Sequence, residues 1–156
     1  MFKATDYPIN AFLDMMAQEA RAKGLDLEIE PFGYSAEFTP LPAAGTLNQV
    51  NATDEDSSFA CLKMMQSARD AGNAIIPYPD VLVTITQDAS GRAMMDRPVQ
   101  INNIFGRGQR PFELDRPFVI GPKASWTTTV QNVDAVNPVT LRLTYWGVKL
   151  YSKPLQ

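Results

Sequence analysis

The sequence contains no histidine, and that absence excludes several classes of enzyme. Ser-His-Asp and Cys-His catalysis, His-ligated zinc sites and the usual histidine general base all need that side chain. No two carboxylates are marked by their sequence setting as the acid and base of a glycosidase. We therefore expect a protein with no catalytic residue, no bound metal and no cofactor.

Cysteine is nearly as scarce, because Cys61 is the only one in the chain. A single cysteine cannot form an internal disulfide or a CxxC site. It lies in SSFACLKMM, where it alternates with Phe59 and Lys63 in the manner of a strand. We expect Cys61 to be a small buried hydrophobic residue of that strand.

Long apolar runs are also missing, and no stretch approaches the length that crosses a bilayer. The N-terminal residues MFKATDYPINAF lack the apolar core and cleavage site of a signal peptide, so export by a classical route is not expected. The 156 residues, 45% of them hydrophobic and 20% charged, are typical of one soluble globular domain.

Basic side chains are few in the first half of the chain. Residues 1–78 hold five basic and eleven acidic residues, a net charge of −6, whereas residues 79–156 hold nine and six, a net charge of +3. Such polarity can attract copies of the chain head to tail, or a charged partner lattice, although a chance scatter of charges would give the same counts. The overall charge of −3 argues against nucleic-acid binding as the main task.

One helix is expected, at residues 9–23, where apolar residues recur at helical spacing. Asn10 is the expected N-cap, with Thr5 or Asp6 as alternatives if the helix begins earlier. Gly24 is the expected C-terminal stop. The apolar stripe docks either on the helix's own domain or on a neighbouring subunit. Its members are Ile9, Phe12, Leu13, Met16, Ala17 and Ala20.

Residues 30–45 carry three prolines and two glycines, which predict an extended, irregular arm. Such an arm either wraps over a neighbour or lies along its own sheet. We therefore divide the chain into an N-terminal helix and arm at residues 1–45 and a β domain at residues 46–156.

From residue 46 onward, short alternating runs are separated by turn residues, which predicts six to eight strands. Strands are expected at 46–52, 58–65, 80–87, 98–105 and 125–132 and from residue 139 onward, with a short apolar piece at 118–121. The segments 66–79 and 106–117 are expected to be a long connection, with room for one helical turn, and a loop. Because the helices that parallel crossovers need are missing, the pattern favours a β-sandwich or jelly roll.

The last expected strand, which starts at residue 139, has two unlike faces. One face, Val139 to Lys149 at alternate positions, is mainly apolar and is the expected core face. The other begins polar and becomes apolar at Trp146, Val148 and Leu150, so its distal half is expected to meet another surface. We take these three residues as interface candidates and expect the protein to form a homo-oligomer.

The loop at 106–117 holds three arginines, Arg107, Arg110 and Arg116, which could clamp carboxylates or phosphates. Its GxG lacks the preceding βαβ unit of a dinucleotide site. We expect the arginines to contact nearby carboxylates, those of residues 113 and 115, or a neighbouring subunit, in preference to a dedicated small-anion site.

Two other clusters have more than one interpretation. The acidic run Asp54–Asp56 is either a solvated turn or a calcium site, although the spacing of an EF-hand loop is missing. The aromatic residues Trp126, Tyr145, Trp146 and Tyr151 are either carbohydrate-stacking or core and interface residues. Because Tyr145 and Trp146 fall on opposite strand faces, they cannot line one platform.

A pattern of turn and strand motifs runs through residues 58–151. A "pv…lfG.g..P" segment is followed by "l.rPf.i.p…l.v.v.N" and then by a closing strand ending near G-x-K-x-Y. The positions that match this pattern are Pro98, Phe105, Gly106, Gly108, Pro111, Pro117, Phe118, Asn132, Gly147, Lys149 and Tyr151. With these motifs, residues 58–151 resemble small tailed-bacteriophage virion proteins, namely jelly-roll decoration (cement) proteins and related minor head or collar proteins. The matching positions are turn and strand positions, so the resemblance implies fold more than role.

The resemblance implies a non-enzymatic virion protein that binds and stabilises the phage head lattice. Its partners would be copies of itself, as a dimer or trimer, and the major capsid protein or other virion proteins. It would lie on the capsid surface or at the head–tail junction, after assembly in the bacterial host cytoplasm. The alternatives are a collar protein and a β-sandwich module of a phage tail that binds carbohydrate or a receptor.

Overall fold

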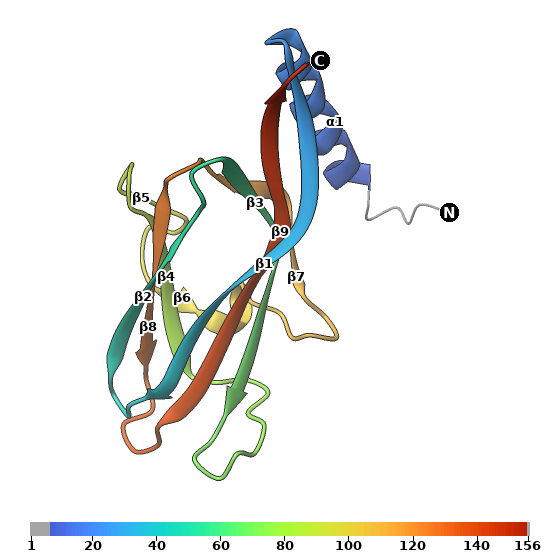
Figure 1. Ribbon diagram of the computed structural model, residues 1–156. Helices are drawn as coiled ribbons and strands as arrows, with labels where there is room; N and C mark the ends of the chain where they lie inside the picture. The colour runs from blue at the N-terminus through green and yellow to red at the C-terminus, as the bar shows by residue number, and fades with distance from the viewer. Residues whose placement is uncertain (1–6, 156) are drawn as a thin grey trace.

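The computed structural model describes residues 7–155, which form two antiparallel sheets and one α-helix (Figure 1). The strands of the first sheet lie in the order β1-β9-β3-β7, and those of the second in the order β2-β8-β4-β5, with β6 also paired to β4. The expectation of a mainly β sandwich or jelly roll with one helix is confirmed. The elements are α1 (Tyr7–Ala22), β1 (Leu25–Leu41), β2 (Thr46–Ala52), β3 (Ser57–Arg69), β4 (Val81–Gln87), β5 (Arg92–Ala93), β6 (Val99–Gln100), the 3-10 turn η1 (Ile101–Asn103), β7 (Phe112–Ile120), β8 (Ser125–Asn132) and β9 (Val139–Pro154).

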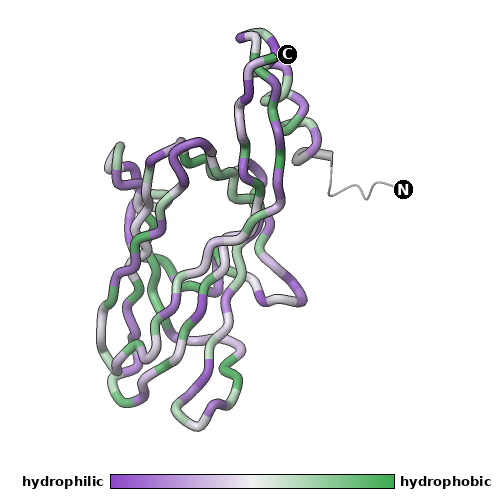
Figure 2. The backbone as a smooth tube through the Cα atoms, viewed as in Figure 1, coloured by the Kyte–Doolittle hydropathy of each residue, from purple (hydrophilic) through white to green (hydrophobic). Residues whose placement is uncertain are grey.

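The core lies between the two sheets, and alternate residues of β4, β8 and most of β9 are buried in it, whereas β2 and β5 contribute none of its members. Figure 2 shows hydrophobic and hydrophilic residues interspersed along the strands. Trp126 is fully buried at its centre and makes edge contacts with Tyr34 and Tyr145, at ring-centroid distances of 5.0 and 5.6 Å. The Tyr145 hydroxyl is hydrogen-bonded to the hydroxyl of Thr128 across the sheets at 2.6 Å. This hydrogen bond gives the buried Tyr145 hydroxyl a partner that it would otherwise lack.

Helix α1 confirms the predicted helix but begins earlier than expected. Asn10 lies inside it, so the N-cap assigned to Asn10 is wrong, and the alternatives Thr5 and Asp6 lie outside the described residues. Gly24 ends the helix as expected. Its φ of +73° is in the left-handed region that glycine adopts without strain, and its amide donates to the Arg21 carbonyl at 2.9 Å.

The prediction that residues 30–45 form an irregular arm is wrong, because most of them form a regular strand. Most of this segment belongs to β1, which pairs with β9 from Leu25 to Leu41 and so is a strand of the first sheet. Proline is tolerated here because β1 is an edge strand, and Pro40 falls where the register shifts between Phe38 and Leu41. Of the two placements considered, the segment lies along its own sheet.

Three other boundaries differ from expectation. The expected strand at 98–105 shortens to β6 followed by η1, because Ile101 and Phe105 are four residues apart and bury the same side of a helical turn. The loop expected at 106–117 ends at residue 111, since Leu114 and Phe118 of β7 pack on the core. The connection expected at 66–79 begins only after β3 ends at Arg69, and it contains no helical turn.

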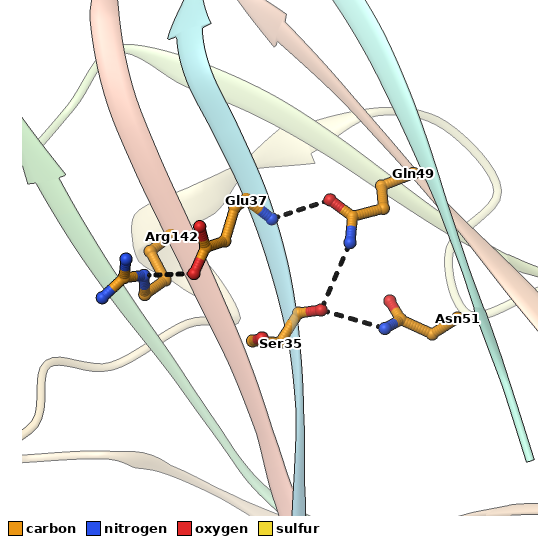
Figure 3. A network of polar contacts seen from close by, with 5 residues as sticks. All are labelled: Ser35, Glu37, Gln49, Asn51 and Arg142. Atoms are coloured by element: carbon orange, nitrogen blue, oxygen red, sulfur yellow. Dashed lines mark hydrogen bonds and ion pairs between the residues drawn. The ribbon is translucent and has the colours of Figure 1, made fainter.

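A side-chain network closes the sandwich where the edge strands β1 and β2 face each other (Figure 3). The Glu37 amide donates to Gln49 Oε1 at 2.7 Å, and the Asn51 side chain donates to the Ser35 carbonyl at 2.9 Å. Arg142 of β9 pairs with Glu37 at 2.8 Å. Side chains thus form hydrogen bonds with backbone groups at the edge of β1, and these groups are no longer available to pair with another chain.

Candidate functional site

The apolar half of β9 meets another surface, as expected, and that surface is the protein's own helix. β1 and β9 extend together beyond β3, and α1 lies along this extension (Figure 1). Val148 and Leu150 lie where β9 is still paired with β3, and they are buried, 8% and 3% exposed, in a second apolar cluster with Ala60 and Leu62 of β3. The helix contributes Phe12, Leu13 and Met16 to it. Of the two docking modes considered for the helix, the structure has it on its own domain.

Trp146 is therefore the exposed member of the three interface candidates on β9. Trp146 is 43% exposed, whereas Tyr145 is 1% exposed, which confirms that the two side chains point to opposite faces. The indole lies over Gly33 of β1, where an ideal Cβ would come within 2.9 Å of its Cε3 atom. The missing side chain of Gly33 thus makes room for the indole.

Arg107 and Arg110 lie at the tip of a tight hairpin. The amide of each donates to the carbonyl of the other, at 2.9 and 2.8 Å. Both side chains are exposed, and the Arg107 guanidinium stands 5.7 Å from the centroid of the Tyr78 ring. Within residues 7–155 neither arginine forms an ion pair. The hairpin therefore presents two guanidinium groups to solvent.

Arg116 lies apart from that hairpin, in β7 at the edge of the first sheet. Residues 114–117 have no partner on β3, because the register shifts between Glu113 and Phe118. Glu113 pairs with Lys63 at 3.3 Å, so it is not the partner expected for the arginines. Arg116 is exposed and has no ion pair within the described part of the chain. The structure thus separates the three arginines into a hairpin pair and an edge residue.

A cleft of about 410 Å³ opens beside the arginine hairpin. We call it the amide pocket, because the side chains of Gln66 and Asn102 lie in its wall, together with Tyr78 and Arg107. Gln66 is 5% exposed on the core side of β3, between the buried residues Met64 and Ala68. The sequence analysis missed this pocket. The available signal was a polar residue at an apolar position of a strand.

The acidic turn at Asp54–Asp56 has a structural role. Asp54 forms an ion pair with Lys149, whose side chain is 9% exposed, and Glu55 pairs with Lys123 at 3.3 Å. The Lys149 ammonium also stands 3.8 Å from the centroid of the Phe32 ring. No group of three or more metal-ligating side chains occurs among residues 7–155, and the three turn residues are exposed.

Cys61 is 1% exposed on the core face of β3, which confirms the expectation that it is a small buried residue. Burial raises the pKa of its thiol from 9.0 to about 12, against a weaker opposing effect of its contact with the Lys63 carbonyl. The folded protein therefore binds the thiol proton more tightly than the unfolded chain does.

This pKa difference predicts instability at alkaline pH. The stabilisation is fully present below pH 9.0 and is lost as pH rises from there toward about 12. One pH unit above the unfolded-state pKa of 9.0, the free energy of unfolding has fallen by about 1.4 kcal/mol. Urea unfolding across this range measures it, with Cys61→Ala as the comparison. An equal pH slope in that variant would assign the effect to other groups, such as Tyr145, whose pKa burial also raises.

Among solved structures, the chain has neighbours of slight similarity, including two of infectious bursal disease virus. The structure of the infectious bursal disease virus VP2 subviral particle aligns with 83% of this chain and 38% of its own, at 10% identity and a TM-score of 0.33. The structure of the Gt strain of that virus aligns with 82% of this chain and 41% of its own, at 16% identity and a TM-score of 0.25. The chain thus spans less than half of each. At these scores the likeness assigns no function.

No protein-family model and no curated protein sequence matches the chain. Among the described residues, no helix is both long and apolar enough to span a membrane.

Proposed function

We propose that the chain is a non-enzymatic structural protein of a tailed-bacteriophage particle. It decorates the outside of the head lattice as a cement protein, in the form of a small homo-oligomer, a dimer or trimer. The resemblance of residues 58–151 supports this role. A second position, the collar at the head–tail junction, is consistent with the same resemblance. In either place the protein assembles with the major capsid protein or another virion protein in the bacterial host cytoplasm.

The observation that carries the proposal is the open edge of β7. The strand ends the first sheet, and its outer side pairs with no strand among residues 7–155. Phe112 and Val119 on this strand are 38% and 37% exposed. Arg116 lies between them in sequence, and its guanidinium forms no ion pair with the described residues. An edge that offers backbone groups, apolar side chains and a cation is suited to docking on another chain.

The expected physical effect of such docking is stabilisation of the shell by mass action. A protein that binds the assembled lattice more tightly than its separate subunits shifts the equilibrium toward the lattice. Contacts that are weak one at a time become strong when an oligomer engages several sites together. A decoration role therefore needs neither a deep cleft nor a catalytic group.

Replacing Arg107, Arg110 and Arg116 together by Gln is expected to weaken binding to purified phage heads, with Arg116→Gln alone giving a large part of the loss. Exposed charges contribute at most about 1 kcal/mol each to folding, so the melting temperature should hardly change. Binding of the wild type should also fall with added salt, because exposed charges are screened over about 10 Å at 0.1 M ionic strength.

Arg97→Gln is the matched control, since Arg97 is also exposed and, among residues 7–155, forms an ion pair only with its neighbour Asp96. Equal binding by the triple variant, the control and the wild type would refute a role for the arginines. Binding to separated tails but not to heads would contradict decoration of the head and favour the collar position. Light scattering of the free protein tests the oligomer, and a monomer both free and on the particle would overturn that part.

A further inference from the structure

The most exposed large apolar side chains of residues 7–155 gather at one end of the sandwich. Tyr78 and Ile75, in the loop between β3 and β4, are 73% and 65% exposed, and Val136, in the loop between β8 and β9, is 79% exposed. Figure 1 shows both loops at the end of the sandwich far from helix α1. Apolar side chains grouped in this way indicate a surface that another protein covers.

One side of the β3–β4 loop borders a cleft of about 560 Å³, which we call the acidic cleft. Among the described residues, its lining holds three carboxylates and no basic side chain: Asp70 and Asp80 come from the β3–β4 loop, and Asp134 comes from the β8–β9 loop. Within the described part of the chain, none of the three forms an ion pair. Hydrogen bonds from Asn137 lower the pKa of Asp134, so this carboxyl group is ionised at neutral pH.

The other side of the same loop borders the arginine hairpin. Ile75 and Ile76 share a groove with Arg107, and Tyr78 lines both the acidic cleft and the amide pocket. The exposed side chains of Arg107 and Arg110 lie on this side, and no carboxylate of the described residues lines the groove or the amide pocket. This end of the molecule therefore has an acidic flank and a basic flank, with an apolar loop between them.

Backbone hydrogen bonds hold the loop and both flanks in place. The Ile76 amide donates to the Ala68 carbonyl at 2.9 Å, which fixes the β3–β4 loop against the end of β3. The Ala44 amide donates to the Asp134 carbonyl at 2.8 Å, and the arginine hairpin is closed by its two reciprocal amide bonds. Because these segments are ordered before binding, an interface built on them loses little conformational entropy.

We propose that this end of the molecule is the contact face of a homodimer with two-fold symmetry. Tyr78 and Ile75 of the two copies pack together near the symmetry axis, and the arginine hairpin of each copy enters the acidic cleft of the other. A two-fold axis brings a patch against itself, so an apolar centre with flanks of opposite charge is self-complementary. This complementarity favours a second copy over an unrelated partner. The proposal deepens the homo-oligomer part of the proposed function and rests on it, but it does not depend on decoration of the head.

The test is sedimentation equilibrium of the full-length protein and of two charge-reversal variants. One carries Arg107→Glu and Arg110→Glu in the hairpin, and the other carries Asp80→Lys and Asp134→Lys in the acidic cleft. In each variant alone, like charges face each other on both flanks, so the dissociation constant of the dimer should rise at least about a hundredfold. In an equimolar mixture each hairpin again meets a cleft of opposite charge, so the heterodimer should have a dissociation constant within about tenfold of the wild-type value.

Melting curves show whether each variant folds. Because Asp134 also accepts hydrogen bonds within its own loop, Asp80→Lys alone is a second cleft variant. It loses a side-chain hydrogen bond with Gln100 and should weaken the dimer at least about tenfold. The matched control, Arg97→Glu with Arg116→Glu, makes the same change of net charge as the hairpin variant at residues that line neither flank, and it should leave the dimer unchanged.

A hairpin variant that dimerises as tightly as the wild type would overturn the proposal, and so would a mixture that stays monomeric. A wild-type trimer, or a dimer that the control breaks and the hairpin variant does not, would refute this face and leave the homo-oligomer intact. A wild type that is monomeric at every concentration would refute both, whereas binding to phage heads is measured separately.

Discussion

Replacing Gly147 by alanine is expected to destabilise the fold by about 3 kcal/mol or more, the upper part of the range for overpacking a rigid interior. An ideal Cβ at this position would lie 1.9 Å from the Ala60 carbonyl oxygen and 3.0 Å from the Cys61 Cα. Both obstacles are backbone atoms of β3, the central neighbour of β9. They cannot turn aside as a flexible side chain would, so the two strands must separate.

The measurement is urea unfolding followed by tryptophan fluorescence, to which the buried Trp126 and the half-exposed Trp146 both contribute, with Gly121→Ala as the matched control. At Gly121 an added Cβ would meet no atom within 4 Å, and φ is outside the left-handed region. The control should therefore unfold close to the wild type. A Gly147→Ala protein with an unchanged midpoint would mean that β3 and β9 do not approach this closely.

Gly147 also shows what the sequence could reveal about the fold. Alternation along Val139 to Lys149 predicted the core face of β9 correctly, because a strand buried on one side forces a period of two. The glycine was visible within that run, but its reason was not. The close contact arises from a register shift on β3 between Cys61 and Lys63, and register shifts depend on strand partners.

Proline misled the prediction of β1 for a related reason. Pro31 and Pro40 argue against a strand only where their missing amides would be needed for pairing. β1 is an edge strand with one paired side, and this follows from the order of the sheet and not from the local sequence. Helix α1 covers Val148 and Leu150, so a contact that was expected with another chain is an internal one.

The candidate sites were harder to predict than the fold. The three arginines were found from composition, but their separation into a hairpin and an edge strand depends on where β7 begins. The amide pocket joins residues from β3, η1 and two loops, and its first and last members, Gln66 and Arg110, are 44 positions apart in sequence. Only Gln66, a polar residue within the apolar row of β3, carried a local signal.

The last prediction concerns Lys149, whose ammonium lies near Phe32 and is paired with Asp54. Replacing Asp54 by Asn is expected to cost about 2 kcal/mol, because a hydrogen bond to a charged group is lost and a mostly buried amine is left without its counter-ion. Replacing Lys149 by Met should cost less than about 1 kcal/mol, since an apolar side chain of similar length fits beside the aromatic rings. Urea unfolding measures both.

The double variant decides between an ion pair and two independent effects. If the pair is the cause, Asp54→Asn should cost almost nothing once Lys149 is Met, because no charge then needs a partner. Asp56→Asn, at an exposed neighbour in the same turn, should have little effect in either background. Additive losses in the double variant would contradict the coupling.

The pair also has a defined pH window. Burial alone would lower the pKa of Lys149, but the hydrogen bond to Asp54 and the neighbouring Tyr34 and Asp54 charges outweigh it, so the pKa lies above its usual 10.5. A raised pKa means that the amine's contribution is fully present below pH 10.5 and is lost as pH rises through the folded-state value. The cost of Asp54→Asn should therefore shrink at strongly alkaline pH. A cost that stays constant there would show that Asp54 stabilises the turn by means other than the lysine charge.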